Sequence, residues 1–279
     1  METTIRTVTH ALDFPGHAAS WALDMAQARQ VRLRPLHCLE AAGPGLPARE
    51  DLWLWLGMPA AAGRGQTGPQ ADAETLTRLN MADCLSDAEL ARAAQFRFEE
   101  DRWSYCAAHA GLRLLLGRIL GEGPRQIRFA TGAKGKPVLC ASHTPPGLAE
   151  RLHFNISHTR GLVAVALSGS PVGVDVERVR PLPDMRRLIT SLMAPEALKA
   201  FAATRNVEDR LDLFFRYWTL GEAFIKATGE GLDQGLDSFA FTESGSPGLT
   251  RVTPGWGDIA RWRFGHAHRP GVEKFSHAA

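Results

Sequence analysis

The sequence predicts an α+β protein, because long helical segments and short strands are interspersed along the chain. Apolar residues recur at helical spacing over residues 98–120 and 207–228. Short runs of Val, Leu, Ile and Phe, bounded by Gly, Pro and Ser, predict strands at 52–56, 153–157 and 161–167. With 279 residues, the chain is long enough for one large domain or two small ones with proper cores.

The composition excludes several classes of function. A chain with 44% hydrophobic and 22% charged residues is typical of a soluble globular protein, and its net charge of +2 argues against a general nucleic-acid binder. The four cysteines, Cys38, Cys84, Cys106 and Cys140, lack the paired spacing of a zinc site and suit a reducing cytoplasm. We find no signal peptide and no apolar run long enough to cross a membrane, so we expect a cytoplasmic protein.

The N-terminal 70 residues carry the weakest signals. The elements expected there are a helix at 20–29, a strand at 31–39, a linker at 41–47, a strand at 52–56 and an exposed loop at 57–70. Residues 1–50 are therefore treated as an N-terminal extension without a clear structure.

A capping box opens the next helix, with Ser86 as the N-cap and Glu89 three residues later. This helix is expected to run through Phe96, and a longer one follows over 98–120. Arginines such as Arg92 and Arg102 decorate both helices, and solvation is the ordinary explanation for them.

A glycine-rich loop follows a short strand at 127–130. Lys134 and Lys136 in this loop suggest an anion, although the spacing is not that of a P-loop. The strand at 153–157 ends at Ser157 and His158. Adjacent residues on a strand point to opposite faces, so we reject a serine nucleophile with a histidine base.

The runs 161–167 and 172–179 are separated by Ser168-Gly-Ser-Pro171, which predicts a hairpin. In the second run Asp175 and Glu177 face the same side, about 6.5–7 Å apart along the strand. Like charges that close repel unless a cation bridges them. An exposed strand face is the ordinary alternative, which the bracketing valines and the small Gly173 make less favourable.

The C-terminal part begins with a helical stretch at 184–201 that Pro195 interrupts. Strands are expected at 237–242 and 261–268, and the tail after 268 is expected to be disordered.

The helix at 207–228 carries an anomalous carboxylate. Glu222 lies in an apolar stripe with Phe215, Trp218 and Ile225, where an unpaired charge would cost several kcal/mol. Lys226 one turn later, or a metal ion, could compensate it. A solvated pair of Glu222 and Lys226 is the ordinary alternative.

Four motifs together resemble the signature of 4′-phosphopantetheinyl transferases of the larger, single-chain class. They are Gly135-Lys136-Pro137, Phe154-Asn-Ile-Ser157-His158, Gly173-Val-Asp175-Val-Glu177 and Trp218-Thr-Leu-Gly-Glu222-Ala-Phe-Ile-Lys226. The resemblance covers roughly residues 85–241. It implies transfer of the phosphopantetheine arm of coenzyme A to a serine of an acyl or peptidyl carrier protein, with release of 3′,5′-ADP.

The resemblance also implies roles for particular residues. Asp175, Glu177 and Glu222 would hold Mg²⁺ on the pyrophosphate of coenzyme A, and Glu222 would help deprotonate the carrier serine. Lys226 would stabilise the departing phosphate. The nucleotide and its 3′-phosphate would be bound by Lys136, Pro137, Ser157 and His158, with Arg92 or Arg102 as the further basic residue. Mg²⁺ prefers this mixture of carboxylates and substrate phosphates.

The implied fold is a pseudo-twofold pair of α/β halves, each a helix on a small antiparallel sheet, with the active site in the cleft between them. We place the halves at 51–168 and 169–268, followed by a disordered tail at 269–279, and expect a monomer. The alternatives are a non-catalytic module that binds coenzyme A or a carrier protein, and a Mg²⁺-dependent phosphodiesterase.

Two positions depart from the family pattern. The family commonly has lysine where this chain has Gly221, and a glycine inside a helix costs about 1 kcal/mol relative to alanine. We therefore expect Gly221→Lys to keep activity and to raise stability slightly. The basic position expected on the second helix appears as Trp103-Ser104. We also expect Asp175→Ala to abolish transfer and leave the fold intact.

Overall fold

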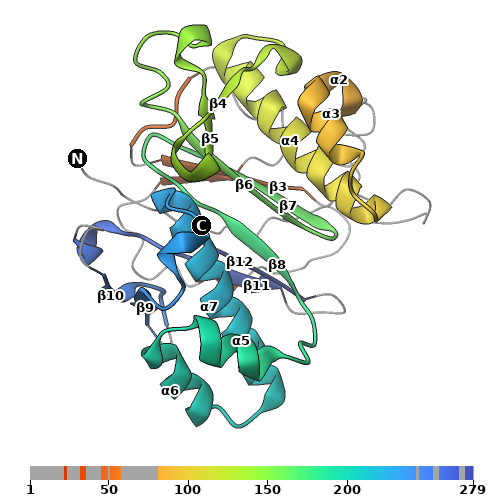
Figure 1. Ribbon diagram of the computed structural model, residues 1–279. Helices are drawn as coiled ribbons and strands as arrows, with labels where there is room; N and C mark the ends of the chain where they lie inside the picture. Colours follow the sequence, from red (N-terminus) through yellow and green to blue (C-terminus); the bar gives the residue numbers. More distant parts are fainter. Residues whose placement is uncertain are drawn as a thin grey trace.

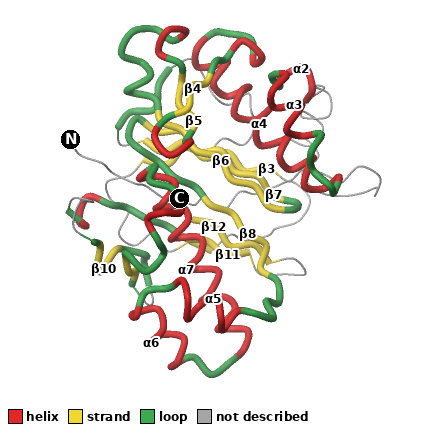
Figure 2. Tube along the Cα trace, viewed as in Figure 1, coloured by secondary structure: helices red, strands yellow, loops and turns green. Residues whose placement is uncertain are grey.

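The fold is described from a computed structural model of the chain. The described residues are 22–23, 32–35, 45–49, 51–57, 81–242, 245–253, 258–269 and 274–278. In Figure 1 two groups of helices and strands lie one above the other, with strand β8 running between them, and Figure 2 shows the same division by type of element.

The first group contains helices and strands up to residue 168. Its elements are β2 (Arg32–Pro35), β3 (Asp51–Gly57), α2 (Met81–Cys84), α3 (Asp87–Ala93), α4 (Glu99–Leu120), β4 (Phe129–Thr131), β5 (Pro137–Leu139), β6 (His153–Thr159) and β7 (Leu162–Ser168). The main sheet has the order β2-β3-β7-β6, and β4 pairs with β5 beside it. All pairs in the main sheet are antiparallel except β2–β3, which is parallel.

Strands β3 and β7 of this sheet are buried on both faces, because successive side chains point to opposite sides and a core lies on each side. Trp53 and Trp55 of β3, with Val163 and Val165 of β7, pack against α4. The residues between them, such as Leu54, face the other way and join a second core with Val172, Val174 and Val176. A strand with two buried faces reads as a continuous apolar run, as β7 does.

The second group contains β8 and the elements after it, together with a short N-terminal strand. Its elements are β1 (Ala22–Leu23), β8 (Asp175–Val179), α5 (Met185–Leu192), α6 (Pro195–Ala203), α7 (Val207–Thr228), β9 (Phe239–Phe241), β10 (Leu249–Val252), β11 (His266–Arg269) and β12 (Lys274–Ala278). The sheet order is β1-β11-β12-β8, all antiparallel, and β9 pairs with β10 separately.

Helix α7 is the centre of the second core. Phe224 is fully buried and meets Phe239 and Trp262 edge to face, with ring centroids 4.9 and 4.7 Å away. Asn206 caps the start of the helix and Gly229, at φ 77°, ends it. From Phe214 to Thr228 every residue of α7 is buried or half-buried, in agreement with the apolar stripe predicted around Glu222.

Several predicted elements are confirmed and others are wrong. The capping box at Ser86, the helices at 98–120 and 207–228, and the strand at 52–56 are present. The break at Pro195 separates α5 from α6. The first capped helix ends at Ala93, earlier than expected. The predicted loop at 57–70 lies outside the described residues, apart from Gly57 at the end of β3.

The hairpin between 161–167 and 172–179 is wrong. Strand β7 already has β3 and β6 on its two edges, so β8 cannot pair beside it. The connecting segment instead contacts Ala48 and Asp51, since Gly169 N–H donates to Ala48 O at 3.3 Å and Ser168 Oγ donates to Asp51 O at 2.9 Å. A side chain at Gly169 would meet the Ala48 backbone at 2.7 Å.

Two predictions about the ends of the chain are also wrong. The tail after 268 is not disordered where it is described, since β12 pairs along the whole of β8. Ala22 and Leu23, expected within a helix, form a short strand against β11. Both strands complete a sheet through partners distant in sequence, which local patterns do not reveal.

Candidate active site

Strand β8 brings the two predicted carboxylates to the junction of the two groups. Its approach to α7 depends on Gly173, where a Cβ would lie 2.0 Å from Ala223 O. Asp175 is only 4% exposed, whereas Glu177 is partly exposed. The close approach therefore places the carboxylates of β8 against the face of α7 that carries Glu222 and Lys226.

Side chains of β6 fix β8 where no strand pairing does. Asn155 Oδ1 accepts a hydrogen bond from Val174 N at 2.8 Å, and Ser157 Oγ accepts one from Val176 N at 3.2 Å. Ser157 Oγ also donates to Asp175 Oδ1 at 2.9 Å. Backbone amides that would otherwise be buried without acceptors are thus satisfied by two side chains of the neighbouring sheet.

Lys226 pairs with Asp175 and not with Glu222. Its Nζ lies 2.6 Å from Asp175 Oδ1, 3.1 Å from Ser157 Oγ and 3.3 Å from Val174 O. The pair is charge-assisted and mostly buried, because Lys226 is 28% and Asp175 5% exposed at the side chain. The apolar stripe of α7 predicted a cation near Glu222. Lys226 is such a cation, but its ammonium pairs with Asp175 of β8.

The remaining carboxylates bind protons more tightly than usual. Burial raises the pKa of Glu177 to about 7, and the charge of Asp175 adds to the rise. The Trp218 Nε1–H donates to Glu177 Oε1 at 3.2 Å and opposes it. Burial and Asp175 also raise the pKa of Glu222, against the effect of Lys226. A further cation nearby would stabilise the ionised forms of Glu177 and Glu222.

The same residues fit a magnesium ion by their chemistry. Asp175 Oδ2 is buried and has no hydrogen-bond partner, which is costly for a carboxylate oxygen. Hard divalent cations take such oxygens as ligands. Among the described residues, however, no three His, Cys, Asp or Glu side chains are close enough together to hold a metal, so the protein alone does not form a complete cage.

Ser157 and His158 point to opposite faces of β6, as expected. Ser157 is directed at Asp175, while the His158 ring meets Tyr105 edge-on at 6.1 Å. Burial, followed by the charges of His109 and Lys226, lowers the pKa of His158 to about 4. The imidazole is therefore neutral at pH 7.

An open cleft of about 1340 Å³ adjoins this cluster, between the start of α4 and the segment that follows β8. Glu177 and His158 both line it. Its basic lining consists of Arg160, Arg178 and Arg180. None of these arginines was predicted, although two of them directly follow the Asp-x-Glu pair in the sequence.

Comparison with known proteins identifies the family of the chain. Residues 171–279 match the model of the 4′-phosphopantetheinyl transferase superfamily, and residues 73–170 match that of the 4′-phosphopantetheinyl transferase N-terminal region. The transferase HetI of Nostoc sp. is 33% identical over 178 residues, which are 63% of this chain and 73% of HetI. The chain belongs to the 4′-phosphopantetheinyl transferase superfamily.

Other relatives of the transferase agree. Sfp of Bacillus subtilis, also a 4′-phosphopantetheinyl transferase, is 28% identical over 56% of this chain and 65% of its own. The human L-aminoadipate-semialdehyde dehydrogenase-phosphopantetheinyl transferase is 31% identical over 56% of this chain and 52% of its own. No helix in the described part of the transferase is both long and apolar enough to span a membrane.

The structure does not bring Lys136 to the carboxylates of the transferase. Its Nζ donates to the main-chain carbonyls of Val172, Lys226 and Ala227. Pro137 next to it is exposed at the start of β5. The ammonium of the lysine in the Gly-Lys-Pro motif is therefore hydrogen-bonded to main-chain carbonyls of the protein itself.

Arg92 and Arg102 lie on exposed helix surfaces of the transferase. Arg92 donates to Gln95 Oε1 at 2.9 Å, and Arg102 lies 3.7 Å from Glu99 within its own helix. Neither lines the cleft, although Arg102 neighbours Asp101, which does. The arginines that line the cleft are instead Arg160, Arg178 and Arg180.

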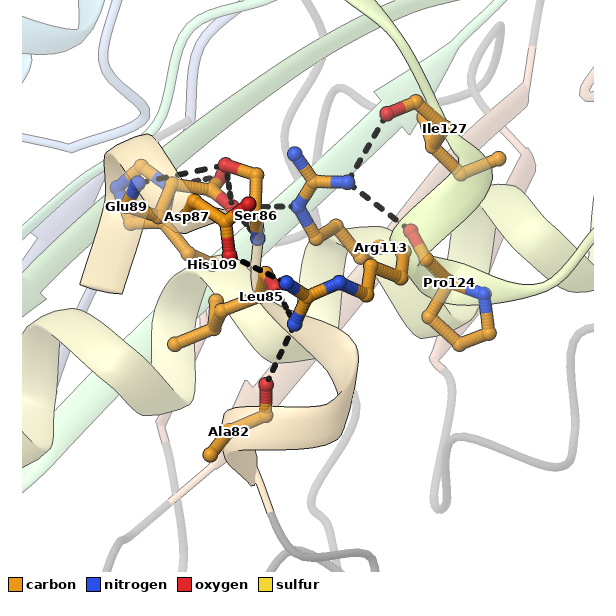
Figure 3. A network of polar contacts seen from close by, with 10 residues as sticks. Ala82, Leu85, Ser86, Asp87, Glu89, His109, Arg113, Pro124 and Ile127 are labelled. Carbon is orange, nitrogen blue, oxygen red and sulfur yellow. Dashed lines mark hydrogen bonds and ion pairs between the residues drawn. The ribbon is translucent and has the colours of Figure 1, made fainter. Parts of the chain in front are cut away.

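The sequence did not predict the structural role of one buried arginine of the transferase. Arg113 of α4 donates to Glu89 Oε2 at 2.7 Å and to the carbonyls of Pro124 and Ile127 at 3.0 and 2.9 Å. Figure 3 shows this network joining α3, α4 and the turn after α4. Its spacing from Glu89 in the sequence carries no signal, because the two residues lie on different helices.

Proposed function

We propose that the transferase moves the 4′-phosphopantetheine arm of coenzyme A to a serine of an acyl or peptidyl carrier protein and releases 3′,5′-ADP. Membership of the family supports this reaction. The observation that carries it is the meeting of Asp175 on β8 with Lys226 on α7, 2.6 Å apart, beside Glu177 and Glu222.

We assign the metal to Asp175, Glu177 and Glu222. The unpartnered Oδ2 of Asp175 and the raised pKa values of Glu177 and Glu222 support a cation among them. Mg²⁺ bound there with the substrate pyrophosphate would neutralise its charge. Mg²⁺ is usually bound by a few carboxylates together with substrate phosphates. A protein site that needs substrate oxygens to complete its coordination therefore suits this ion.

Glu222 is the proposed base. The carrier serine forms a bond from its oxygen to the pantetheine-side phosphorus, and the pyrophosphate P–O bond to the nucleotide breaks. The serine proton passes to Glu222, directly or through water. Burial raises the pKa of Glu222, so this carboxylate accepts a proton more readily than a solvated glutamate. The Lys226 ammonium offsets charge on the departing phosphate.

The nucleotide is assigned to the cleft between α4 and the extension of β8. His158 lines it and can donate a hydrogen bond to the 3′-phosphate, with Arg178 and Arg180 as cationic groups on the same cleft. Ser157 positions Lys226 and Asp175 and has no hydroxyl proton left for the nucleotide. Arg102 is retained as a further candidate because it neighbours the cleft.

The two halves are proposed to divide between β7 and β8. The boundaries of the two family matches, at residues 170 and 171, support a division close to the one expected at 168. The cleft between α4 and β8 takes residues from both halves, which supports an active site between them. Since both halves belong to one chain, we propose that the transferase acts as a monomer.

The mass of a carrier protein tests the function. Wild-type transferase, coenzyme A and Mg²⁺ are incubated with several apo carrier proteins, and both the carrier mass and the free coenzyme A are measured. Transfer increases the carrier mass by one phosphopantetheine. Consumption of coenzyme A without that increase would indicate a phosphodiesterase, and neither change would indicate a binding module, either of which would overturn the proposal.

A further inference from the structure

Lys136 occupies a place where three segments of the chain meet. It lies in the loop between β4 and β5, far in sequence from its partners. Its Nζ donates to Lys226 O at 2.6 Å, Val172 O at 3.1 Å and Ala227 O at 3.4 Å. An ammonium has three protons, so these three carbonyls can use all of its donors.

The two partners on α7 belong to its last turn. Carbonyls at the end of a helix have no partner within the helix and carry the negative end of its dipole, so they favour a cation. Lysine side chains near a helix C-terminus commonly bind such carbonyls. Burial lowers the pKa of Lys136 to about 8, which leaves the amine mostly protonated at pH 7.

The loop around Lys136 is shaped for this contact. Gly132 N–H donates to Lys136 O at 2.8 Å, and a Cβ at Gly132 would lie 2.8 Å from that same oxygen. On the other side, Gly229 ends α7 at φ 77°. A Cβ added to Gly229 would lie 3.6 Å from Lys136 Cδ. Gly132 thus allows the tight loop that presents Lys136, and the end of α7 lies at van der Waals distance from the Lys136 side chain.

The carbonyl nearest to Lys136 belongs to Lys226 itself. The main chain of Lys226 is held by Lys136 of the first group, and its side chain by Asp175 and Ser157. Any shift of the helix end would move the Lys226 ammonium relative to Asp175.

We propose that Lys136 is a positioning residue that fixes the last turn of α7 to the N-terminal half and so sets the place of Lys226, in preference to binding the 3′-phosphate of coenzyme A. This inference rests on the proposed function for the role of Lys226. The contact of Lys136 with the helix end does not depend on that role. The two can therefore be tested separately.

The kinetic test compares Lys136→Met with Lys136→Arg and with Lys134→Met as a matched control. Lys134 is in the same loop but is exposed and paired with Asp233 at 3.0 Å. We measure kcat and KM for coenzyme A and for dephospho-coenzyme A, which lacks the 3′-phosphate. We expect Lys136→Met to lower kcat at least tenfold with both substrates, with the ratio of their KM values within about twofold of wild type. Lys136→Arg should recover part of kcat, and Lys134→Met should resemble wild type.

A selective rise of KM for coenzyme A in Lys136→Met, with kcat retained, would overturn the proposal in favour of a phosphate ligand. Unchanged kinetics would overturn it as well. If Lys136→Met does not fold, Lys136→Gln, which keeps two N–H donors, takes its place in the same comparison.

A second readout does not depend on activity. Amide hydrogen exchange over residues 225–229 should be faster in Lys136→Met than in wild type and in Lys134→Met, because the helix end loses its anchor. Equal exchange in all three would refute the anchoring role. If wild type transfers no arm to any carrier while exchange rises as expected, the proposed function fails and the contact stands.

Discussion

Lys226 Nζ lies 2.6 Å from Asp175 Oδ1, across 51 residues of sequence. Helical spacing alone would pair Lys226 with Glu222, one turn away. Lys226 pairs with Asp175 because Asp175 is almost completely buried. An unpaired charge there would cost more free energy than one on the more exposed Glu222. The contact joins Asp175, a proposed metal ligand, to the lysine that we propose stabilises the departing phosphate.

This pairing changes the expected result of Asp175→Ala. The sequence alone suggested that removing a repelling charge would leave the fold intact. In the structure the substitution leaves Lys226 partly buried without its counterion, so we expect a loss of about 1–3 kcal/mol in the free energy of unfolding as well as loss of transfer. Urea unfolding measures the first effect and the carrier mass assay the second.

A double-mutant cycle is the control for this prediction. Asp175→Asn and Lys226→Met each leave one partner behind, whereas the double variant removes both charges. We expect the double variant to be less destabilised than the sum of the two single variants. Simple additivity would mean that the pair does not contribute to stability.

Two glycines near the site should respond differently to alanine. A Cβ at Gly173 would meet backbone atoms, Ala223 O at 2.0 Å and Ala227 N at 2.6 Å, which cannot move without displacing α7. A Cβ at Gly221 would meet the tip of the Leu236 side chain at 2.5 Å, which can rotate away. Gly173→Ala should therefore cost several kcal/mol, and Gly221→Ala at most about 1 kcal/mol after the gain in helix propensity. Thermal unfolding of the two variants checks this, and equal melting temperatures would contradict it.

The same geometry reverses the expectation for Gly221→Lys. Gly221 is buried and faces Leu236 and Phe239, so a lysine there would have to place its charge beside an aromatic core or force the chain apart. We expect lower stability and lower activity than in Gly221→Ala. A more stable Gly221→Lys variant would show that the side chain escapes to solvent.

The elements predicted well are those specified by local sequence. The capping box of Ser86 and Glu89 and the glycine that ends α7 act within a few residues, and both are present as expected. The side of β8 that carries Asp175 and Glu177 also follows from a period of two residues. These features require no knowledge of the rest of the chain.

The features that the sequence did not reveal depend on long-range contacts. Strand β8 pairs with β12, about a hundred residues later, and not with its neighbour β7. Lys136 binds carbonyls, which carry no sequence signature at all. Arg178 and Arg180 line a cleft whose other residues include Asp101 and Ser104 of α4, far away in the sequence. Each of these depends on which segments meet, and local patterns do not determine that.

The network of Glu89 predicts a dependence of stability on pH. Burial alone would raise the pKa of Glu89, but hydrogen bonds from His109, the Ser86 backbone and Arg113 outweigh it and lower the pKa to about 2. The value in the unfolded chain is about 4.3. A carboxylate with a lowered folded pKa stabilises the fold fully above the unfolded pKa, and this contribution is lost as the pH falls toward 2.

We therefore expect Glu89→Gln to lower the free energy of unfolding by on the order of 2–3 kcal/mol at pH 7, with a smaller difference from wild type at pH 3. Urea unfolding at both pH values measures it. Asp87→Asn is the matched control, because Asp87 is 92% exposed at the side chain and pairs only at the surface with Arg125. A difference that stays constant with pH would exclude the ionised Glu89 as its source.

The last strand provides the fifth prediction. Strand β12 lies between β11 and β8, with Ser276 opposite Glu177 and Ala278 opposite Asp175. Without it the backbone of β8 loses its ladder on that edge, and β11 loses its connection to the site. A chain ending at residue 270 should therefore lose transfer activity and melt at a lower temperature, while one lacking only Ala279 should behave as wild type. Because Ser157 and Asn155 still hold the other edge of β8, we expect the truncated chain to remain folded in its N-terminal half, with near-native exchange protection in α4 and β7. Full activity of the chain ending at residue 270 would show that β8 keeps its carboxylates in place without β12.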